Sequence, residues 1–196
     1  QTTRVYDSPF RGMSDSKDAD SLQNLTAAEA WFELGLIDEK AKPTIRGTVF
    51  SCFSRGEGLA IAAALEDENY PIKELVLDLV NLRAGHRFAS FSQSESRLAI
   101  VCRETFGFRD CSGYLRAGLP LEYGEGAAEI IRDESIIKSQ NHPDQELSAG
   151  DWERVKVEWR SLLSLIANGI ESSFHRWSAL QDEALHILGD KRNSEE

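Results

Sequence analysis

The chain has 196 residues, of which 41% are hydrophobic and 28% are charged, and its formal net charge is -11 at pH 7. This size and composition suit one domain with its own hydrophobic core, and no apolar run approaches the ~18 residues of a membrane-spanning helix. A strongly negative chain repels phosphate groups, so nucleic-acid binding requires a local group of basic side chains. We therefore expect a soluble cytoplasmic protein without a membrane partner.

The three cysteines, Cys52, Cys102 and Cys111, form no Cys-x-x-Cys pair, and no histidine stands beside them at the spacing of a zinc site. An odd number of thiols without such patterns indicates a reducing compartment, and it predicts neither a disulfide framework nor a metal. The chain starts at Gln1 and its only methionine is Met13, so the sequence leaves open whether it is part of a longer polypeptide.

The N-terminal residues 1–25 are rich in Ser, Asp, Gln and Arg and follow neither a helical nor a strand period, which is typical of an arm or linker. Thr26 and Glu29 have the spacing of a capping box, in which each side chain binds a backbone N–H of the other residue. This pattern predicts a helix over 27–34 that ends at Gly35.

The next segments mix β-branched, aromatic and small apolar residues. Residues 44–53 are dense in β-branched and aromatic side chains, which favours a short strand or hairpin. Residues 58–66 are almost entirely Leu, Ile and Ala, which predicts a buried helix. Pro71 suits the first position of a helix over 72–83.

The middle of the chain contains a second capping-box pattern, formed by Ser92 and Glu95, ahead of a helix that Gly107 should end. Residues 108–126 are rich in glycine and predict a loop with a helical turn. Residues 127–137 are expected to be helical.

The C-terminal part carries the clearest helical periodicity. After Ser148, apolar residues recur every three or four positions as far as Gly169, and a second amphipathic helix is expected over 172–188. The whole pattern predicts a mainly α helical bundle over 26–189 with a small β-hairpin or winged-helix-like element, followed by a polar tail over 190–196.

No catalytic, metal-binding or cofactor-binding pattern is complete. Gly56-Glu57-Gly58 opens a predicted helix, but no P-loop lysine follows it, and a tight helix entry explains it better; the same holds for Gly124-Glu125-Gly126. The histidines are scattered outside any metal or triad pattern, and the densest run of carboxylates, 66–68, is typical of a solvated turn. We predict no catalytic residue, metal or cofactor, although an unrecognised carboxylate site stays as a minor alternative.

One basic cluster stands out in this acidic chain. Arg83, His86 and Arg87 follow the predicted helix 72–83, and Arg97 and Arg103 lie on the next helix. Such a cluster can bind phosphates, but pairing of these guanidinium groups with the abundant carboxylates is the explanation that we favour.

The order of several short motifs resembles that of a known family. Trp-Phe-Glu-Leu-Gly-Leu-Ile at 31–37 is followed by Thr-Ile-Arg-Gly-Thr-Val at 44–49 and by a helical Leu/Ala stretch. Further on come Gly-Ala-Ala at 126–128 and Gly-Asp-Trp-Glu-Arg at 150–154. This order is similar to that of the region after the motor core of superkiller-type (Ski-like) DExH helicases, and the resemblance covers roughly residues 26–177.

The resemblance implies a function and a set of contacts. In the family, a long helix of this form lies against the nucleic-acid strand, and Arg154 matches the first arginine of that helix, whereas Val157 and Glu158 replace the basic pair that should follow. It implies an accessory C-terminal domain that packs on helicase motor domains, in cis if the chain is a fragment, and guides single-stranded RNA or DNA past Arg154, with Arg83 and Arg87 as further contacts.

The chain lacks the phosphate-binding Gly-Lys-Thr loop and the Asp-Glu-x-His motif of the motor, so it should not hydrolyse ATP alone. The alternative is a helical module that binds a protein partner through its Trp-bearing helices and binds no nucleic acid.

Overall fold

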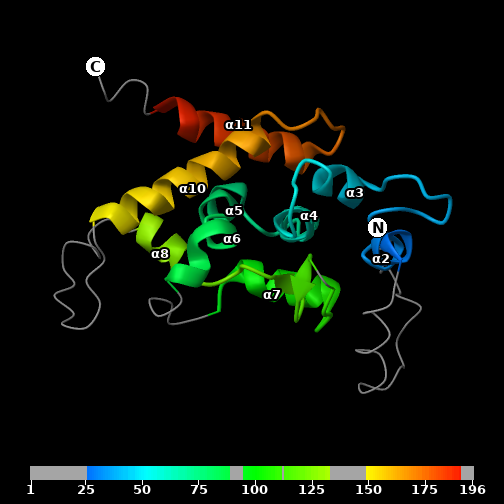
Figure 1. The fold of residues 1–196 in the computed structure, drawn as a ribbon. Coiled ribbons are helices and arrows are strands. Elements are labelled where there is room, and N and C mark those ends of the chain that lie inside the picture. The colour runs from blue at the N-terminus through cyan, green and yellow to red at the C-terminus, as the bar shows by residue number, and fades with distance from the viewer. Residues whose placement is uncertain (1–25, 89–94, 112, 133–148, 191–196) are drawn as a thin grey trace.

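The computed structural model describes residues 26–88, 95–111, 113–132 and 149–190 (Figure 1). Helices dominate these residues, and one two-stranded antiparallel sheet accompanies them, which confirms the predicted mainly α fold class with a small hairpin. The predicted arm 1–25, the positions Ser92 and Ser148, and nearly all of the polar tail lie outside the described residues.

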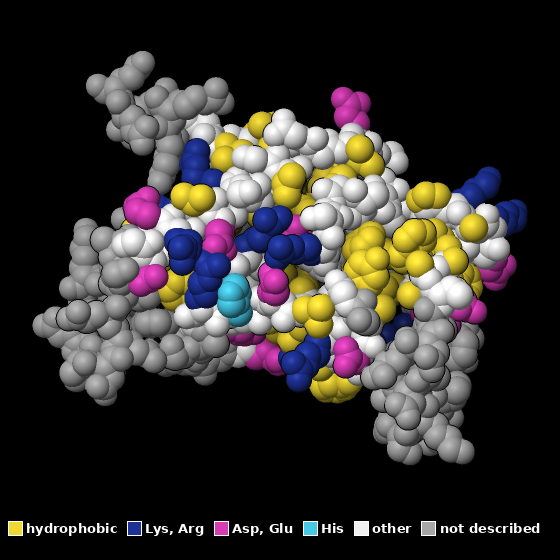
Figure 2. Space-filling model, viewed as in Figure 1, with side chains coloured by type: hydrophobic (Ala, Val, Ile, Leu, Met, Phe, Trp, Pro, Cys, Tyr) yellow, Lys and Arg dark blue, Asp and Glu magenta, His cyan; other side chains and the backbone are white. Residues whose placement is uncertain are grey.

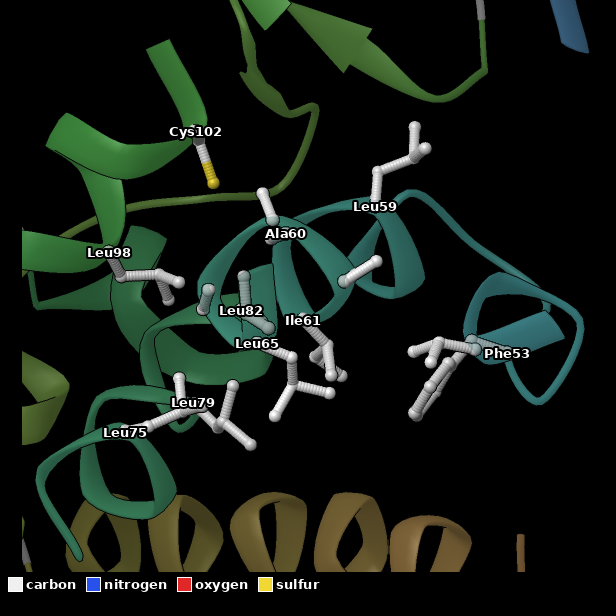
Figure 3. Close-up of a cluster of buried hydrophobic side chains, with 14 of the residues drawn as sticks. Phe53, Leu59, Ala60, Ile61, Leu65, Leu75, Leu79, Leu82, Leu98 and Cys102 are labelled. Carbon is white, nitrogen blue, oxygen red and sulfur yellow. The ribbon is translucent and has the colours of Figure 1, made fainter. Parts of the chain in front are cut away.

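The centre of the molecule is helix α4 (Glu57–Glu66), which is buried from Glu57 to Leu65. Its Leu, Ile and Ala side chains leave no polar face, so other elements must cover it on every side. Figure 3 shows side chains of α5 (Ile72–Asp78) and α7 (Arg97–Phe106) pointing toward it from different directions. The sequence prediction of a buried helix here is confirmed.

The N-terminal part holds α2 (Ala27–Glu33), which begins with the predicted capping box of Thr26 and Glu29. The strand or hairpin predicted for 44–53 is wrong, because this segment contains helix α3 (Ile45–Phe50). Thr44 has extended backbone, and its side-chain oxygen accepts a hydrogen bond from the Gly47 N–H at 3.0 Å. This N-cap starts a helix that β propensity alone argues against.

The single helix predicted over 72–83 is divided in the structure. α5 ends at Asp78, α6 (Asn81–Ala84) follows, and the 3₁₀-helix η2 (Gly85–Arg87) continues the chain. Hydrogen bonds between residues three apart, such as that from the Leu82 N–H to the Leu79 carbonyl, tighten the backbone at the junction.

α7 begins after Ser96, whose hydroxyl accepts a hydrogen bond from the Ala99 N–H. The capping box predicted for Ser92 and Glu95 is wrong, because Glu95 precedes the helix and forms an ion pair with Arg103. The helix ends at Gly107, which has a positive φ of 68°, as predicted. The hairpin lies beyond it, in the segment predicted to be a loop. Strands β1 (Leu115–Arg116) and β2 (Leu119–Pro120) pair antiparallel through a turn at Ala117 and Gly118, both with positive φ. Two positive-φ residues give the turn a twist that matches the strands.

The C-terminal helices α10 (Ala149–Ala167) and α11 (His175–Asp190) pack against each other, as Figure 1 shows, and confirm the two amphipathic helices of the sequence. α11 continues through Gly189, where the sequence predicted its end. Before α10 lies α8 (Ala127–Arg132); the rest of the helix predicted to 137 falls outside the described residues.

Two groups of buried apolar side chains form the core. The larger surrounds α4, and the smaller lies between α6, α8 and α10, around Phe88, Ile130 and Val155. Trp159 of α10 packs against both groups and donates its indole N–H to the Val76 carbonyl at 2.8 Å. In the stretches that the structure describes, no helix is both long and apolar enough to cross a membrane.

Candidate nucleic-acid interface

Helix α10 exposes one side to solvent while its opposite side packs on the core. Residues three, four and seven apart share a face of a helix, so the exposed positions form a continuous stripe along it. We call this the α10 stripe, and its members are Arg154, Val157, Ser161, Ser164, Leu165 and Asn168. Four of these six side chains are hydrogen-bond donors. The carboxylates of Glu153, which is exposed, and of Glu158, which is half-buried, flank the stripe on α10.

Arg154 lies near the N-terminal end of the α10 stripe. Its side chain is exposed, and no carboxylate of the described residues lies within salt-bridge distance of its guanidinium group. An exposed guanidinium without a partner can bind a phosphate without first giving up another contact.

Arg87 is brought to the same side of the molecule by an ion pair. Its Nη1 atom lies 2.5 Å from Oε1 of Glu158, which stands one helical turn beyond Arg154 on α10. Both partners are partly exposed, and an exposed pair of this kind contributes at most about 1 kcal/mol. A phosphate could therefore compete with Glu158 for Arg87, although the released carboxylate would repel it.

Arg83 has a different role in the fold. Its Nε and Nη2 atoms donate to the two carboxylate oxygens of Glu57 at 2.8 Å and 2.6 Å, and the Glu57 side chain is only 2% exposed. A buried carboxylate needs this compensation, so Arg83 is committed to the start of α4. The structure therefore places Arg87 against Glu158, one helical turn from Arg154 in the sequence of α10, whereas Arg83 is held by the core.

The geometry also explains the motif Gly56-Glu57-Gly58. A side chain at Gly56 would place its Cβ 1.9 Å from the Tyr114 carbonyl oxygen, so only glycine fits the contact between α4 and the hairpin. The motif is a tight helix entry, as predicted, with a buried ion pair that the sequence analysis missed. A glutamate flanked by glycines at the start of a wholly apolar helix was the available signal.

The remaining arginines of the basic cluster are also paired. Arg97 lies 2.8 Å from Asp67, and Arg103 forms an ion pair with Glu95. Figure 2 shows Lys and Arg side chains gathered on one face with Asp and Glu side chains among them. The favoured interpretation of the cluster, pairing with carboxylates, is confirmed for these arginines.

Buried polar groups elsewhere are tied into structural hydrogen bonds. The Tyr70 hydroxyl donates to the buried Asp78 carboxylate at 2.5 Å, and Arg132 pairs with the same carboxylate. Burial, reinforced by the charge of Asp78, raises the pKa of Tyr70 well above its ordinary value, so this hydroxyl stays protonated. Among the described residues, no three His, Cys, Asp or Glu side chains come together in a way that could hold a metal ion.

A second surface lies at the end of the molecule that carries α2 and α3, where Figure 2 shows hydrophobic side chains at the right. No residue of α2 is buried, and Trp31 and Phe32 are 39% and 48% exposed. Adjacent positions on a helix point about 100° apart, so one short helix cannot turn both rings inward. The capping box predicted this helix, but the exposure of its two aromatic rings was not predicted.

Comparison with protein-family models, with curated proteins and with solved structures finds no match to this chain.

Proposed function

We propose that the chain is an accessory C-terminal domain of an ATP-dependent DExH-type helicase, which packs on the motor domains and guides single-stranded nucleic acid along α10. The observation that carries the proposal is Arg154, an exposed cation without a carboxylate partner among the described residues, at one end of the α10 stripe. The motif order that resembles the superkiller-type helicases supports the same role.

The chemistry of the α10 stripe suits a phosphate backbone. Guanidinium, hydroxyl and amide groups supply most protein contacts to phosphate and sugar, and Arg154, Ser161 and Asn168 provide one of each. The 19 residues of α10 extend over about 28 Å, which is long enough to follow several nucleotides. Arg87 would join this path by exchanging Glu158 for a phosphate. Arg83 would not, because its bidentate pair with the buried Glu57 neutralises its charge.

The role is one of guidance, and ATP hydrolysis would belong to the motor domains. A chain with a net charge of -11 needs local contacts to retain a strand, because its overall field repels phosphates. We therefore expect weak binding by this chain alone, with a strong dependence on salt.

The test is the binding of single-stranded DNA and RNA at low and moderate salt, measured by fluorescence anisotropy, with Arg154→Glu as the variant. Arg116→Glu is the matched control, because Arg116 is exposed on β1 and makes the same change of charge away from α10. We expect Arg154→Glu to weaken binding at least about 10-fold and to reduce the salt slope by about 0.7, the value for one phosphate contact on a single strand. Equal losses in both variants, or no binding by the wild-type chain, would contradict strand guidance.

A second candidate is a helical protein-interaction module, which the exposed aromatic side chains of α2 favour. A photo-crosslinking residue in place of Phe32 tests it, and the control is the same residue in place of Leu185, which is 54% exposed on α11. Crosslinking of one protein species at position 32 and none at position 185 would support the module. Equal, non-specific products at both positions would count against it.

A further inference from the structure

A groove runs along the C-terminal half of α10, beside the segment that joins α3 to α4. Its volume is about 450 Å³, which falls within the range of pockets that bind small organic groups. The residues that line it come from these two parts of the chain and from the turn after α10: Cys52, Ser161, Ser164, Leu165, Asn168, Gly169 and Ile170.

The lining of the groove is uncharged. Ser161, Ser164 and Asn168 offer hydroxyl and amide groups, and Leu165 and Ile170, 41% and 48% exposed, give it apolar walls. An ionic group placed there would lack a partner for its charge, whereas a planar ring with polar edges would find both apolar contact and hydrogen bonds. A nucleobase with its sugar has this chemistry.

The groove is continuous with the α10 stripe, since Ser161, Ser164, Leu165 and Asn168 belong to both. Arg154 and Ser161 are seven residues apart, which places them about 10.5 Å apart along the helix axis. Three nucleotide steps of a stacked strand cover about the same distance, at about 3.4 Å each. A phosphate at Arg154 and a nucleotide in the groove can therefore belong to one strand.

We propose that this groove holds the base and sugar of one nucleotide of the strand whose phosphate, about three nucleotides away, binds Arg154. The proposal rests on the strand-guiding function. It adds a second contact that depends on base and sugar rather than on charge. Binding at the groove should consequently be much less sensitive to salt than binding at Arg154.

Cys52 supplies a direct readout of the groove. It is the half-buried cysteine of the three, while Cys102 and Cys111 are buried. Burial also raises the pKa of the Cys102 thiol to about 12, and it raises the pKa of Cys111. Because the thiolate is the reactive form, an alkylating reagent should label Cys52 first in the folded chain, and Cys52→Ser should remove that labelling.

The experiment measures the alkylation rate of Cys52 in the whole chain with oligonucleotides of two to eight nucleotides. We expect protection to strengthen steeply once the oligonucleotide reaches about four nucleotides, the length that spans Arg154 and the groove. Ser164→Asp, which adds a negative charge to the groove, should weaken binding about 10-fold. Ala117→Asp, the same change of charge on the exposed turn between β1 and β2, should leave binding unchanged.

Each outcome separates the groove from the proposed function. If oligonucleotides bind in an Arg154-dependent way but Cys52 is alkylated at its free rate, the strand bypasses the groove, and this proposal is wrong while strand guidance stands. If the wild-type chain binds no oligonucleotide, both are wrong. If a short apolar peptide protects Cys52 and oligonucleotides do not, the groove belongs to a protein partner and the nucleotide assignment is overturned.

Discussion

At the scale of single residues, the pair formed by Glu57 and Arg83 shows how a buried charge sets the start of the central helix. We expect Arg83→Met to lower the free energy of unfolding by about 3 kcal/mol, because it leaves the Glu57 carboxylate buried without its partner. Urea denaturation measures this loss. Arg55→Met is the matched control, because the Arg55–Glu122 pair is exposed and should contribute at most about 1 kcal/mol.

The double variant Glu57→Leu with Arg83→Met tests whether the loss of stability comes from the unpaired Glu57 charge. Removing both charges should restore most of the lost stability, since a buried pair replaced by apolar groups is often neutral. If the double variant is as unstable as Arg83→Met alone, the loss came from packing of the arginine stem and not from the unpaired charge.

Cys102 gives the chain a dependence on alkaline pH. Burial raises its pKa from an ordinary value near 9 to about 12 in the fold, so the unfolded chain releases this proton first as pH rises. The contribution of this thiol to the free energy of unfolding is therefore complete below pH 9. It falls by about 1.4 kcal/mol per pH unit between about pH 9 and 12. Cys102→Ala should have a lower free energy of unfolding than the wild type at pH 7.5. Between pH 9 and 10, however, the free energy of unfolding of this variant should fall less than that of the wild type. Parallel curves for both chains would disprove this role of the thiol.

At the scale of elements, close backbone contacts link segments far apart in the sequence. Gly85 lies so near the segment before α8 that a Cβ at this position would sit 1.7 Å from the Gly124 carbonyl oxygen. We expect Gly85→Ala to destabilise the fold by about 2 kcal/mol, because the backbone must shift to admit the methyl group. Thermal unfolding provides the measurement.

Gly189→Ala serves as the control for this prediction. Gly189 lies in α11 with open space at its Cβ position, so alanine should raise stability by about 0.5 kcal/mol through its higher helix propensity. A Gly85→Ala chain as stable as the wild type would mean that the contact between η2 and residue 124 adapts without cost.

The sequence predicted elements whose signals are local and failed where distant contacts decide. The capping box at Thr26 and the apolar period of α10 are local, and both predictions hold. At 44–53, propensity favoured a strand, but the Thr44 cap and the fit of Gly47 against the Leu36 carbonyl produce a helix. The hairpin turn at Ala117 and Gly118 lacks the Asn-Gly or Asp-Gly pair that marks such turns.

In the candidate site, too, local features could be predicted from the sequence and distant partners could not. The position of Arg154 on a solvent-exposed face follows from the period of the helix that carries it. The partners of Arg83 and Arg87 could not be read from the sequence, because Glu57 and Glu158 lie 26 and 71 residues away from them along the chain. The groove was missed because it is formed by Cys52 and α10 together.

At the scale of the whole molecule, Arg176 ties the last helix to the first half of the chain. Its guanidinium donates to the carbonyls of Leu65, Glu68 and Tyr70, at 2.9, 3.3 and 2.6 Å, at the C-terminal end of α4 and in the turn that follows it. We expect Arg176→Gln to lower the free energy of unfolding by about 2–3 kcal/mol, because carbonyls bonded to a charged donor lose that partner. Chemical denaturation tests it.

Arg160→Gln is the appropriate comparison, since Arg160 makes one carbonyl contact, to Leu188 at 3.3 Å, between neighbouring helices. Arg160→Gln should lower the free energy of unfolding by less than about 1 kcal/mol. Similar losses in the two variants would show that the Arg176 contacts contribute no more than a single local bond.

The burial of α4 on all sides has a consequence for how its amide hydrogens exchange with solvent. A helix of Leu, Ile and Ala with no exposed face cannot open alone, because every neighbouring element must move before water reaches its backbone. Deuterium should therefore enter α4 only when the entire chain unfolds. Its exchange rate would then report the global stability of the native protein in plain buffer, and α2, which buries no residue, should exchange long before it.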